Sequence, residues 1–318
     1  MKKYLNELAN ALKSKGFSQA EIDEILADHS EMIESAIEEG LSEDAIESKF
    51  GSPDAVAADL KEMGMKEEPK IEDAKDFKTV STFNIDQEEI NVEIKLVNDD
   101  YTVERTDGNQ IEVLVKGRYN PDDFRFTFQN GSFQAEMKSK IKGFTLHFGS
   151  SPEFLFRIPN VFIKNMNLVS VSGDVSVDSI RGGRFEMKST NGDVQLSSLD
   201  LDTFKMDSVN GDVKIQTIIA NSSSMSSVSG DVKIDKMVLS GDLFVNNVSG
   251  DFTVTNSSCE ECAFKTVSGD VSGQEFYPKR IRLHSISGDI SIVNKNRTSH
   301  IEIIERKSLS GSIKIVNV

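Results

Sequence analysis

Seven aspartates recur in the second half of the chain, each directly after a glycine, and their spacing is the feature most suggestive of chemistry: Asp174, Asp193, Asp212, Asp231, Asp251, Asp270 and Asp289. Carboxylate oxygens are ligands that calcium prefers, so the row raises the hypothesis of a calcium site. Calcium-binding solenoids, however, carry a Gly-Gly-x-Gly-x-Asp nonapeptide that this repeat lacks. We therefore favour aspartates that accept backbone N–H groups beside the glycine and face solvent. We predict neither a metal ion nor a cofactor.

The elements that position these aspartates follow from their period. The glycines are separated by steps of 19, 19, 19, 20, 19 and 19 residues, and a degenerate copy follows at Gly311. A fixed period of this length is typical of a repeat architecture. An apolar residue stands two residues after each glycine, and another stands four residues after each except Gly269, where Gly273 takes its place. This alternation, as in Val175 and Val177, predicts a half-buried strand.

A second alternating run precedes the turn, with pairs such as Phe185 and Met187, which stand seven and five residues before the glycine. A third inward position, twelve residues before the glycine, is predicted to fill the far corner; its members are Ile180, Leu199, Ile218, Val238 and Phe276. Two strands and two turns then make one coil, and coils stacked in register place like residues about 4.8 Å apart. The predicted fold is mainly β, a β-solenoid (β-helix) of about 19-residue coils with a small N-terminal α-helical bundle.

Each turn carries Ser-Gly-Asp or Asn-Gly-Asp. We expect the glycine to supply a positive φ at a tight corner, and the serine or asparagine before it to bond locally to the turn backbone. This interpretation explains the motif without a ligand.

The sequence offers little support for an enzyme. Asp200, Asp202 and Asp207 are close enough in the chain to form the carboxylate pair of a glycosidase. Nothing distinguishes them from other solvated acids, and the chain has no Trp and only four Tyr to stack on sugar rings. We predict no catalytic residues, and leave a polysaccharide-active or calcium-binding β-helix as a further alternative.

The only two cysteines, Cys259 and Cys262, form a Cys-x-x-Cys pair. A zinc site needs a second pair of ligands, and a redox pair needs a thioredoxin-like helix start, and neither is visible. Cys262 occupies the inward position that Phe185 holds in another coil, so we predict an ordinary buried thiol.

The chain has 318 residues and a net charge of −16. Residues 1–73 hold 8 Lys/Arg against 19 Asp/Glu, a net of −11, which leaves −5 for the remainder. Such an acidic surface repels nucleic acid, so we predict no nucleic-acid partner. The N-terminus lacks an uninterrupted apolar region, which argues against a signal peptide, and no run approaches the roughly 18 apolar residues of a membrane span. We expect a cytoplasmic protein or one peripheral to the inner membrane face, and leave surface exposure open.

The first sixty residues show helical periodicity. Leu5, Leu8 and Leu12 predict a helix that Gly16 ends. Ser18 to Glu21 forms a capping box before a longer helix with His29 on its apolar stripe, where we expect a core role. Ala45, Ile46 and Phe50 suggest a third helix, and Ser52-Pro53 begins a fourth that runs through Leu60.

The segment from Lys2 to Leu60, with the run Glu34 to Gly40 and Phe-Gly-Ser-Pro-Asp-Ala-Val-Ala at Phe50 to Ala57, resembles the HAAS signalling domain of Gram-positive bacteria. The resemblance implies a protein partner for the helical domain, in particular a membrane-associated regulator, and a role in cell-envelope stress signalling. We expect this acidic helical domain to span residues 1–63.

A charged segment, residues 64–76, reads as a linker. Eight further runs alternate like strands, bounded by turn residues: Val80 to Ile85, Ile90 to Val97, Tyr101 to Arg105, Ile111 to Lys116, Phe124 to Phe128, Phe133 to Met137, Phe144 to Phe148 and Phe154 to Ile158. Phe154 to Gly173, with Phe-x-Phe-x-Ile-Pro and Val-Ser-Val-Ser-Gly-Asp-Val, resembles the bacterial putative-adhesin family of unknown function. That resemblance implies a β-solenoid over residues 77–318 and defines no catalytic residues.

Irregular coils are where a repeat protein most often carries interaction surfaces. The cluster Tyr277, Lys279, Arg280 and Arg282 is the best local patch of this kind, and we predict it to be an interaction site. Unpaired strand edges at the solenoid ends also allow pairing between two copies, so we leave the formation of a homo-oligomer open.

The preferred function is a non-enzymatic interaction scaffold; a surface adhesin that binds glycan or protein is the alternative.

Overall fold

The computed structural model describes residues 2–38, 50–64, 74–117, 119–138, 152–295 and 300–317. It divides into a helical unit within residues 1–72 and a β unit that begins at Asp73. The two units are described separately.

The helical unit contains α1 (Lys2–Ser14), α2 (Gln19–Glu38) and α4 (Pro53–Gly64). Leu8, Leu12 and Ile33 are fully buried in its core, to which all three helices contribute. The predicted capping box is present, since the Ser18 N–H donates to Glu21 Oε2 at 2.6 Å. His29 is buried as expected, with its Nδ1 3.0 Å from the Ile25 carbonyl oxygen. The predicted third helix lies outside the described residues except for Phe50.

The β unit opens with an irregular cap in which β1 (Ala74–Asn84), β4 (Gln110–Gly117) and β7 (Glu153–Pro159) pair antiparallel. β5 (Phe124–Gln129) and β6 (Ser132–Met137) form a second antiparallel pair. Rings of Phe124, Phe154 and Phe156 meet in its core, with centroids 4.8 to 6.0 Å apart. The predicted strands of this region are confirmed, except that Phe144 to Phe148 lies outside the described residues.

Cap strands separate the first solenoid coil from the second along the chain. β2 (Glu89–Lys95) lies parallel between β6 and β8 (Phe162–Ser170), and β3 (Asp100–Thr106) lies parallel between β7 and β9 (Val175–Asp178). The chain therefore leaves the solenoid after β3, builds the cap, and rejoins the stack at β8. Asp100 thus lies beside Asp174 although 74 residues separate them.

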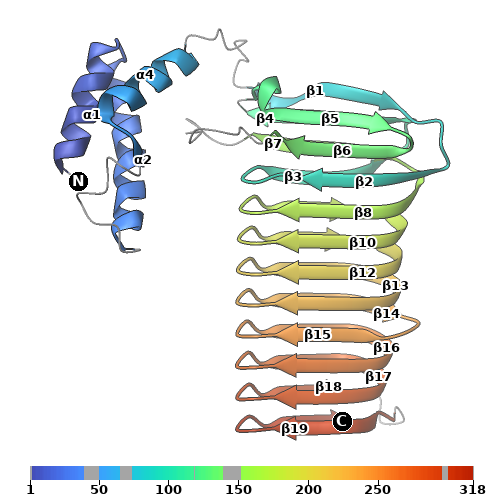
Figure 1. The fold of residues 1–318 in the computed structure, drawn as a ribbon. Coiled ribbons are helices and arrows are strands. Elements are labelled where there is room, and N and C mark those ends of the chain that lie inside the picture. Colours follow the sequence, from blue (N-terminus) through green and yellow to red (C-terminus); the bar gives the residue numbers. More distant parts are fainter. Residues whose placement is uncertain are drawn as a thin grey trace. The chain divides into compact units, whose positions relative to one another are not determined.

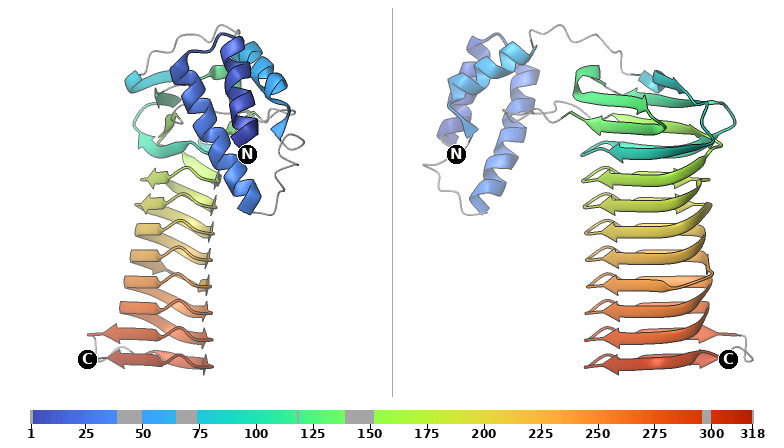
Figure 2. Two further views of the ribbon diagram at one scale, coloured as in Figure 1. Left: turned by 90° about the vertical axis from the view of Figure 1, so that its left-hand side faces the viewer. Right: turned by 45° about the vertical axis from the view of Figure 1, so that its right-hand side comes forward.

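The remaining coils stack in parallel and in register, except for a shift at Ile281 and Arg282, with the turns aligned along one edge (Figure 1). Their strands are β10 (Arg181–Ser189), β11 (Val194–Ser197), β12 (Leu199–Ser208), β13 (Val213–Ser227), β14 (Val232–Leu239), β15 (Leu243–Asn247), β16 (Phe252–Thr266), β17 (Val271–Ser285), β18 (Ile290–Asn294), β19 (Glu302–Ser308) and β20 (Ile313–Asn317). The stacked strands are seen from two further directions in Figure 2. The predicted β-solenoid is confirmed.

The apolar columns fill the interior as predicted, with one exception. Val175, Val194 and Val213 follow one another in register and are at most 1% exposed. Val238, predicted to face inward, is 38% exposed, and Met237 pairs with Ile218 in the buried column instead. The extra residue of the 20-residue step lies between Leu239 and Leu243, after this corner, so counting back from the following glycine misplaces it by one residue.

The predicted positive φ at the repeat glycines is wrong. The glycines with positive φ are Gly16, Gly51, Gly117 and Gly131 among the described residues, and none belongs to a repeat turn. A Cβ built on a repeat glycine from Gly192 onward would lie closer than 3.0 Å to the carbonyl oxygen of the glycine one coil earlier. Glycine is therefore required by the close approach of stacked turns.

Candidate interaction site

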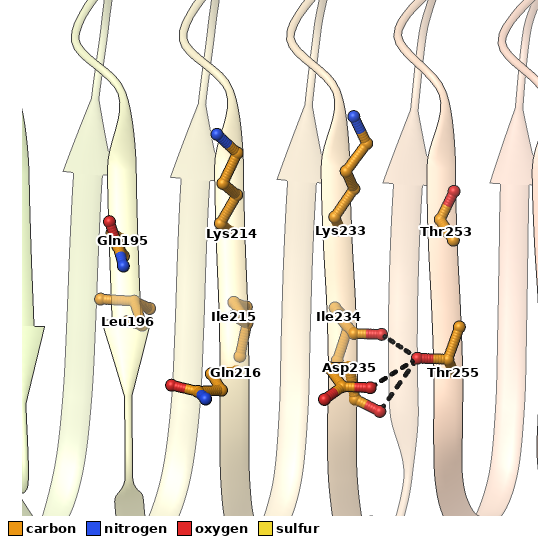
Figure 3. Close-up of a pocket in the computed structure, with 10 residues that line it drawn as sticks. All are labelled: Gln195, Leu196, Lys214, Ile215, Gln216, Lys233, Ile234, Asp235, Thr253 and Thr255. Atoms are coloured by element: carbon orange, nitrogen blue, oxygen red, sulfur yellow. Dashed lines mark hydrogen bonds between the residues drawn. The ribbon is translucent and has the colours of Figure 1, made fainter.

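A shallow groove of about 520 Å³ lies over part of β11, β13, β14 and β16. It is lined by outward side chains of β11, β13, β14 and β16, among them Lys214, Lys233 and Asp235 (Figure 3). Thr255 Oγ1 lies 3.0 Å from Asp235 Oδ1, so this hydroxyl and carboxylate are occupied with each other. The groove mixes polar residues with the aliphatic Leu196, Ile215 and Ile234, and its lining residues include no arrangement of nucleophile and base.

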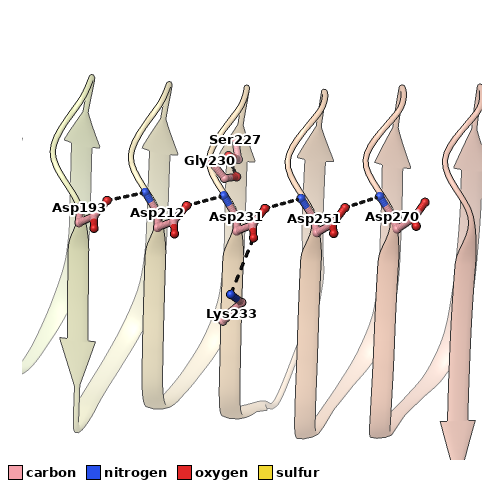
Figure 4. Close-up of polar contacts among 8 residues, drawn as sticks. All are labelled: Asp193, Asp212, Ser227, Gly230, Asp231, Lys233, Asp251 and Asp270. Carbon is pink, nitrogen blue, oxygen red and sulfur yellow. Dashed lines mark hydrogen bonds and ion pairs between the residues drawn. The ribbon is translucent and has the colours of Figure 1, made fainter.

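The edge formed by the repeat turns is more distinctive, and its first column is the row of aspartates (Figure 4). Each carboxylate accepts a hydrogen bond from the backbone N–H of the residue one coil later: Asp193 donates its N–H to Asp174 Oδ1 at 2.8 Å, and Asp212 donates to Asp193 Oδ1 at 2.9 Å. The series of these bonds begins where the Asp174 N–H donates to Asp100 Oδ1 and ends where the Ser312 N–H donates to Asp289 Oδ1. The donor–acceptor distances are 2.7 to 3.0 Å. The acceptors are therefore those predicted, but the donors lie one coil further on.

The calcium hypothesis for this row stays a prediction. Within the described residues, no three His, Cys, Asp or Glu side chains lie together in a way that could hold a metal ion. One oxygen of each carboxylate is already used by a backbone N–H group, which offsets part of the repulsion between neighbouring charges.

A buried hydroxyl or amide three residues before each glycine closes the turn. Ser208 Oγ donates to the Gly211 carbonyl oxygen at 3.1 Å, and Thr266 Oγ1 does the same to Gly269 at 2.6 Å. The residue directly before the glycine, which we expected to make this bond, is exposed and bonds to its neighbour in the stack. Asn210 Nδ2, for example, donates to Asn191 Oδ1 at 2.8 Å.

Substitution of Ser208 by alanine should lower the free energy of unfolding by about 1 to 2 kcal/mol, because a buried carbonyl loses its donor. Ser208→Thr should cost less, since threonine makes this bond at position 266. Urea denaturation followed by far-UV circular dichroism measures both. Equal midpoints for Ser208→Ala and the wild type would show that the bond contributes nothing.

The sequence reasoning missed the second column of the edge, two residues before each glycine. We call it the aliphatic ladder: Val171, Val209, Val228, Val248, Val267 and Ile286. These side chains are 38% to 49% exposed. Val97 continues the ladder at one end with 39% exposure, and Leu309 at the other with 83%. The 19-residue recurrence of an aliphatic at this offset is visible in the sequence, but periodicity alone assigns it to the core.

The predicted basic cluster lies on β17, where its charges are paired. Lys279 Nζ lies 2.5 Å from Glu260 Oε1, and Glu261 accepts from Arg280 Nε at 3.2 Å and Arg282 Nε at 2.6 Å. The hydrogen bond from Arg282, then that from Arg280, lowers the pKa of Glu261. Tyr277 Oη donates to Glu275 Oε2 at 2.5 Å. The structure brings the four residues together on one strand; their role as an interaction site stays a prediction.

The other candidate residues serve the solenoid. Cys259 and Cys262 are buried and free, and Cys262 stands between Leu243 and Ile281 in an inward column, where burial raises the pKa of its thiol. Asp200 and Asp202 are outward side chains of β12. Asp207 Oδ2 lies 3.3 Å from Lys205 Nζ.

A buried acidic position was also missed. Asp99 lies where later coils have glycine, since a Cβ on Gly173 would collide with the Asp99 carbonyl oxygen. Its side chain is 1% exposed, and Asp99 Oδ2 has no hydrogen-bond partner among the described residues. Burial, with added repulsion from Asp100 and Asp123, raises the pKa of Asp99 to about 7.

The stacked coils and the edge formed by their turns define the protein as a β-solenoid of single-coil repeats, which follows a helical domain in the sequence. A family model described as Toastrack DUF4097 matches residues 80–314, and the chain belongs to that family. A HAAS family model matches residues 3–59. No curated protein matches the chain. In the described residues, no helix is long and apolar enough to cross a membrane.

Two solved structures illustrate the fold similarity. A putative adhesin from Parabacteroides merdae is similar with a TM-score of 0.52 and 12% identity, over 76% of this chain and 96% of that chain. A putative lipid binding protein from Parabacteroides distasonis is similar with a TM-score of 0.51 and 17% identity, over 76% of this chain and 97% of the other. At these identities the likeness concerns the fold.

Proposed function

We propose that the protein is a non-enzymatic interaction scaffold of bacterial cell-envelope stress signalling, in which the helical domain binds a protein partner and the solenoid presents a rigid surface. The observation that carries the scaffold role is the parallel stacking of the coils, which keep one register except for a shift at Ile281 and Arg282 between β17 and β19. Most inward positions stack apolar on apolar, with Ser223 between Phe204 and Leu243 as an exception, and the turn N–H groups and aspartates are bonded between coils. Such a one-dimensional stack holds its outward columns at fixed spacing.

The helical domain supports the docking role through its family and its charge. Residues 1–73 carry a net of −11, which favours a partner with a basic surface and disfavours nucleic acid and anionic lipid. We propose that this partner is a membrane-associated regulator and that the protein works in the cytoplasm or at the inner membrane face. Domain limits of 1–63, 64–76 and 77–318 are part of the proposal; β1 begins at Ala74, within the last residues of the proposed linker.

Deletion of residues 1–66 tests the docking role. After crosslinking in cells, the full chain should capture a partner that the truncated chain does not, while the truncated chain keeps a β-type circular dichroism spectrum and its unfolding transition. Capture by the truncated chain at an unchanged level would contradict docking through the helical domain. Protease shaving of intact cells locates the protein: loss of the solenoid signal would favour the surface adhesin instead.

A further inference from the structure

The aliphatic ladder is an exposed apolar stripe that the solenoid does not need for its own core. One member of the column, Thr190, is a hydroxyl residue, and the coils on both sides keep their register, so the fold accepts a polar side chain there. All the other repeat turns from Gly173 to Gly311 nevertheless place Val, Ile or Leu at this exposed position. Apolar area that recurs in a line is typical of an interaction site.

A line of negative charge runs beside the ladder. Each aspartate of the row uses Oδ1 for the next coil's N–H group, as Asp212 does for Asp231 at 2.9 Å. Among the described residues, the one ion pair in the row joins Asp231 to Lys233 at 3.8 Å. The other carboxylates of the row form no ion pair within the described residues, and each lies about 4.8 Å from the next one. A partner that brings cations to this edge relieves that repulsion.

The geometry of the ladder favours a helix over a strand as the partner. Seven steps from Val171 to Leu309 span about 34 Å, which matches about 22 residues of α-helix. A helix repeats its apolar stripe about every 5.4 Å, close to the coil spacing, whereas one face of a strand repeats about every 6.7 Å. Backbone groups at the turns are paired between coils, as in Asn191 N–H to the Val171 carbonyl at 2.8 Å, so the edge offers little for strand pairing.

We propose that the turn edge is a docking surface for an amphipathic α-helix of another protein, with Lys or Arg along the border of its apolar stripe. The chain's own described helices use their apolar faces inside the helical unit. A second copy of the solenoid edge brings a second row of carboxylates, and an anionic membrane is repelled by the first. This surface is separate from the partner site proposed on the helical domain.

A synthetic peptide is a direct probe of the edge. We suggest a fluorescent 22-residue peptide of leucine and lysine with leucine at i, i+3, i+4 and i+7, titrated with the full chain and followed by fluorescence anisotropy. A scrambled peptide of the same composition has no apolar face and should bind at least about tenfold more weakly. Binding of the helical peptide should weaken as salt rises from 50 to 300 mM.

Substitutions on the ladder test the apolar part. Val209→Ser with Val228→Ser and Val248→Ser should weaken peptide binding about tenfold or more. Because three serines could loosen the turns, the same three positions changed to threonine provide a second variant that Thr190 shows to be compatible with the fold. The matched control changes exposed apolar residues outside the ladder, Ile219, Val238 and Phe244, to serine and should leave the affinity unchanged.

Substitutions in the aspartate row test the charge. Asp212→Asn, Asp251→Asn and Asp270→Asn keep an oxygen for the next coil's N–H group and remove three charges. This variant should bind the peptide several-fold more weakly, with a smaller dependence on salt, at an unchanged melting temperature or a raised one.

Three results would overturn the proposal. One is equal affinity of the ladder variants and their control. Another is equal binding of the helical and scrambled peptides, which indicates attraction to net charge alone. The third is a dimer of the full chain in light scattering that the ladder variants dissociate, which assigns the edge to a second copy. Each outcome leaves the test of the helical domain unaffected.

Discussion

Replacement of Gly211 by alanine should destabilise the solenoid by about 3 kcal/mol and lower its melting temperature by about 6 to 12 °C. The new Cβ would lie well inside van der Waals contact with the Gly192 carbonyl oxygen, and that oxygen belongs to backbone that both neighbouring coils hold in place. This clash is relieved only if the two turns separate, and their separation lengthens the hydrogen bond from the Asp212 N–H to the Asp193 carboxylate. Thermal unfolding followed by far-UV circular dichroism measures the loss.

Gly108→Ala is the matched control. Gly108 has no positive φ, and the nearest atom to its added Cβ is Thr106 Oγ1 at 3.8 Å. This substitution should change the free energy of unfolding by less than about 0.5 kcal/mol. If Gly211→Ala has the same melting temperature as Gly108→Ala and the wild type, the close approach between coils is not the reason for glycine at the turns.

The glycine column shows where sequence reasoning reaches its limit. The 19-residue period predicted the coil, its two strands and the parallel register, because alternation within a strand and repetition between coils are both written in the order of residues. The reason for glycine was misassigned. Turn rules consider the φ and ψ of one segment, whereas the constraint at Gly211 comes from a carbonyl oxygen 19 residues away.

Contacts between residues one coil apart also account for other features that the sequence analysis did not find. Lys279 and Arg280 meet Glu260 and Glu261, which stand 19 residues before them. Subtracting the 19-residue period from the numbers of Lys279 and Arg280 identifies both glutamates. Val238 was misplaced because the period was counted across the extra residue. The aliphatic ladder was visible as a repeat, but hydrophobicity cannot tell an inward column from an exposed one at a turn, where strand alternation ends.

Asp99 could not be aligned with the repeat from sequence alone. Val97 to Asp100 occupies the place of Val171 to Asp174 in the next coil, but because the cap lies between them the equivalent residues are 74 positions apart instead of about 19. Asp99 therefore belongs to a turn whose later members are glycines. Its carboxyl is enclosed, with Asp100 and Asp123 as the charged groups that act on it.

Asp99→Asn should stabilise the β unit at pH 8 by about 2 to 4 kcal/mol, and have little effect at pH 4. The pKa of Asp99 is raised from 3.8 to about 7, so the folded state retains a proton that the unfolded state releases. Between these two values the folded state binds more protons, and its stability falls as pH rises. Above pH 7 the full cost of the buried charge is present, whereas below pH 3.8 both states are protonated. An amide of the same shape carries no charge at any of these pH values.

Urea denaturation of Asp99→Asn and the wild type at pH 4, 6 and 8 measures this gap, with Asp107→Asn as the control. Asp107 is an exposed residue of the turn between β3 and β4, so its substitution should leave the pH dependence of the wild type unchanged. The gap for Asp99→Asn should widen steadily from pH 4 to pH 8, because only the wild type pays for ionisation of a carboxylate with an unpaired oxygen. A gap that stays constant over this range would mean that Asp99 titrates alike in both states, with its carboxylate solvated in the folded cap.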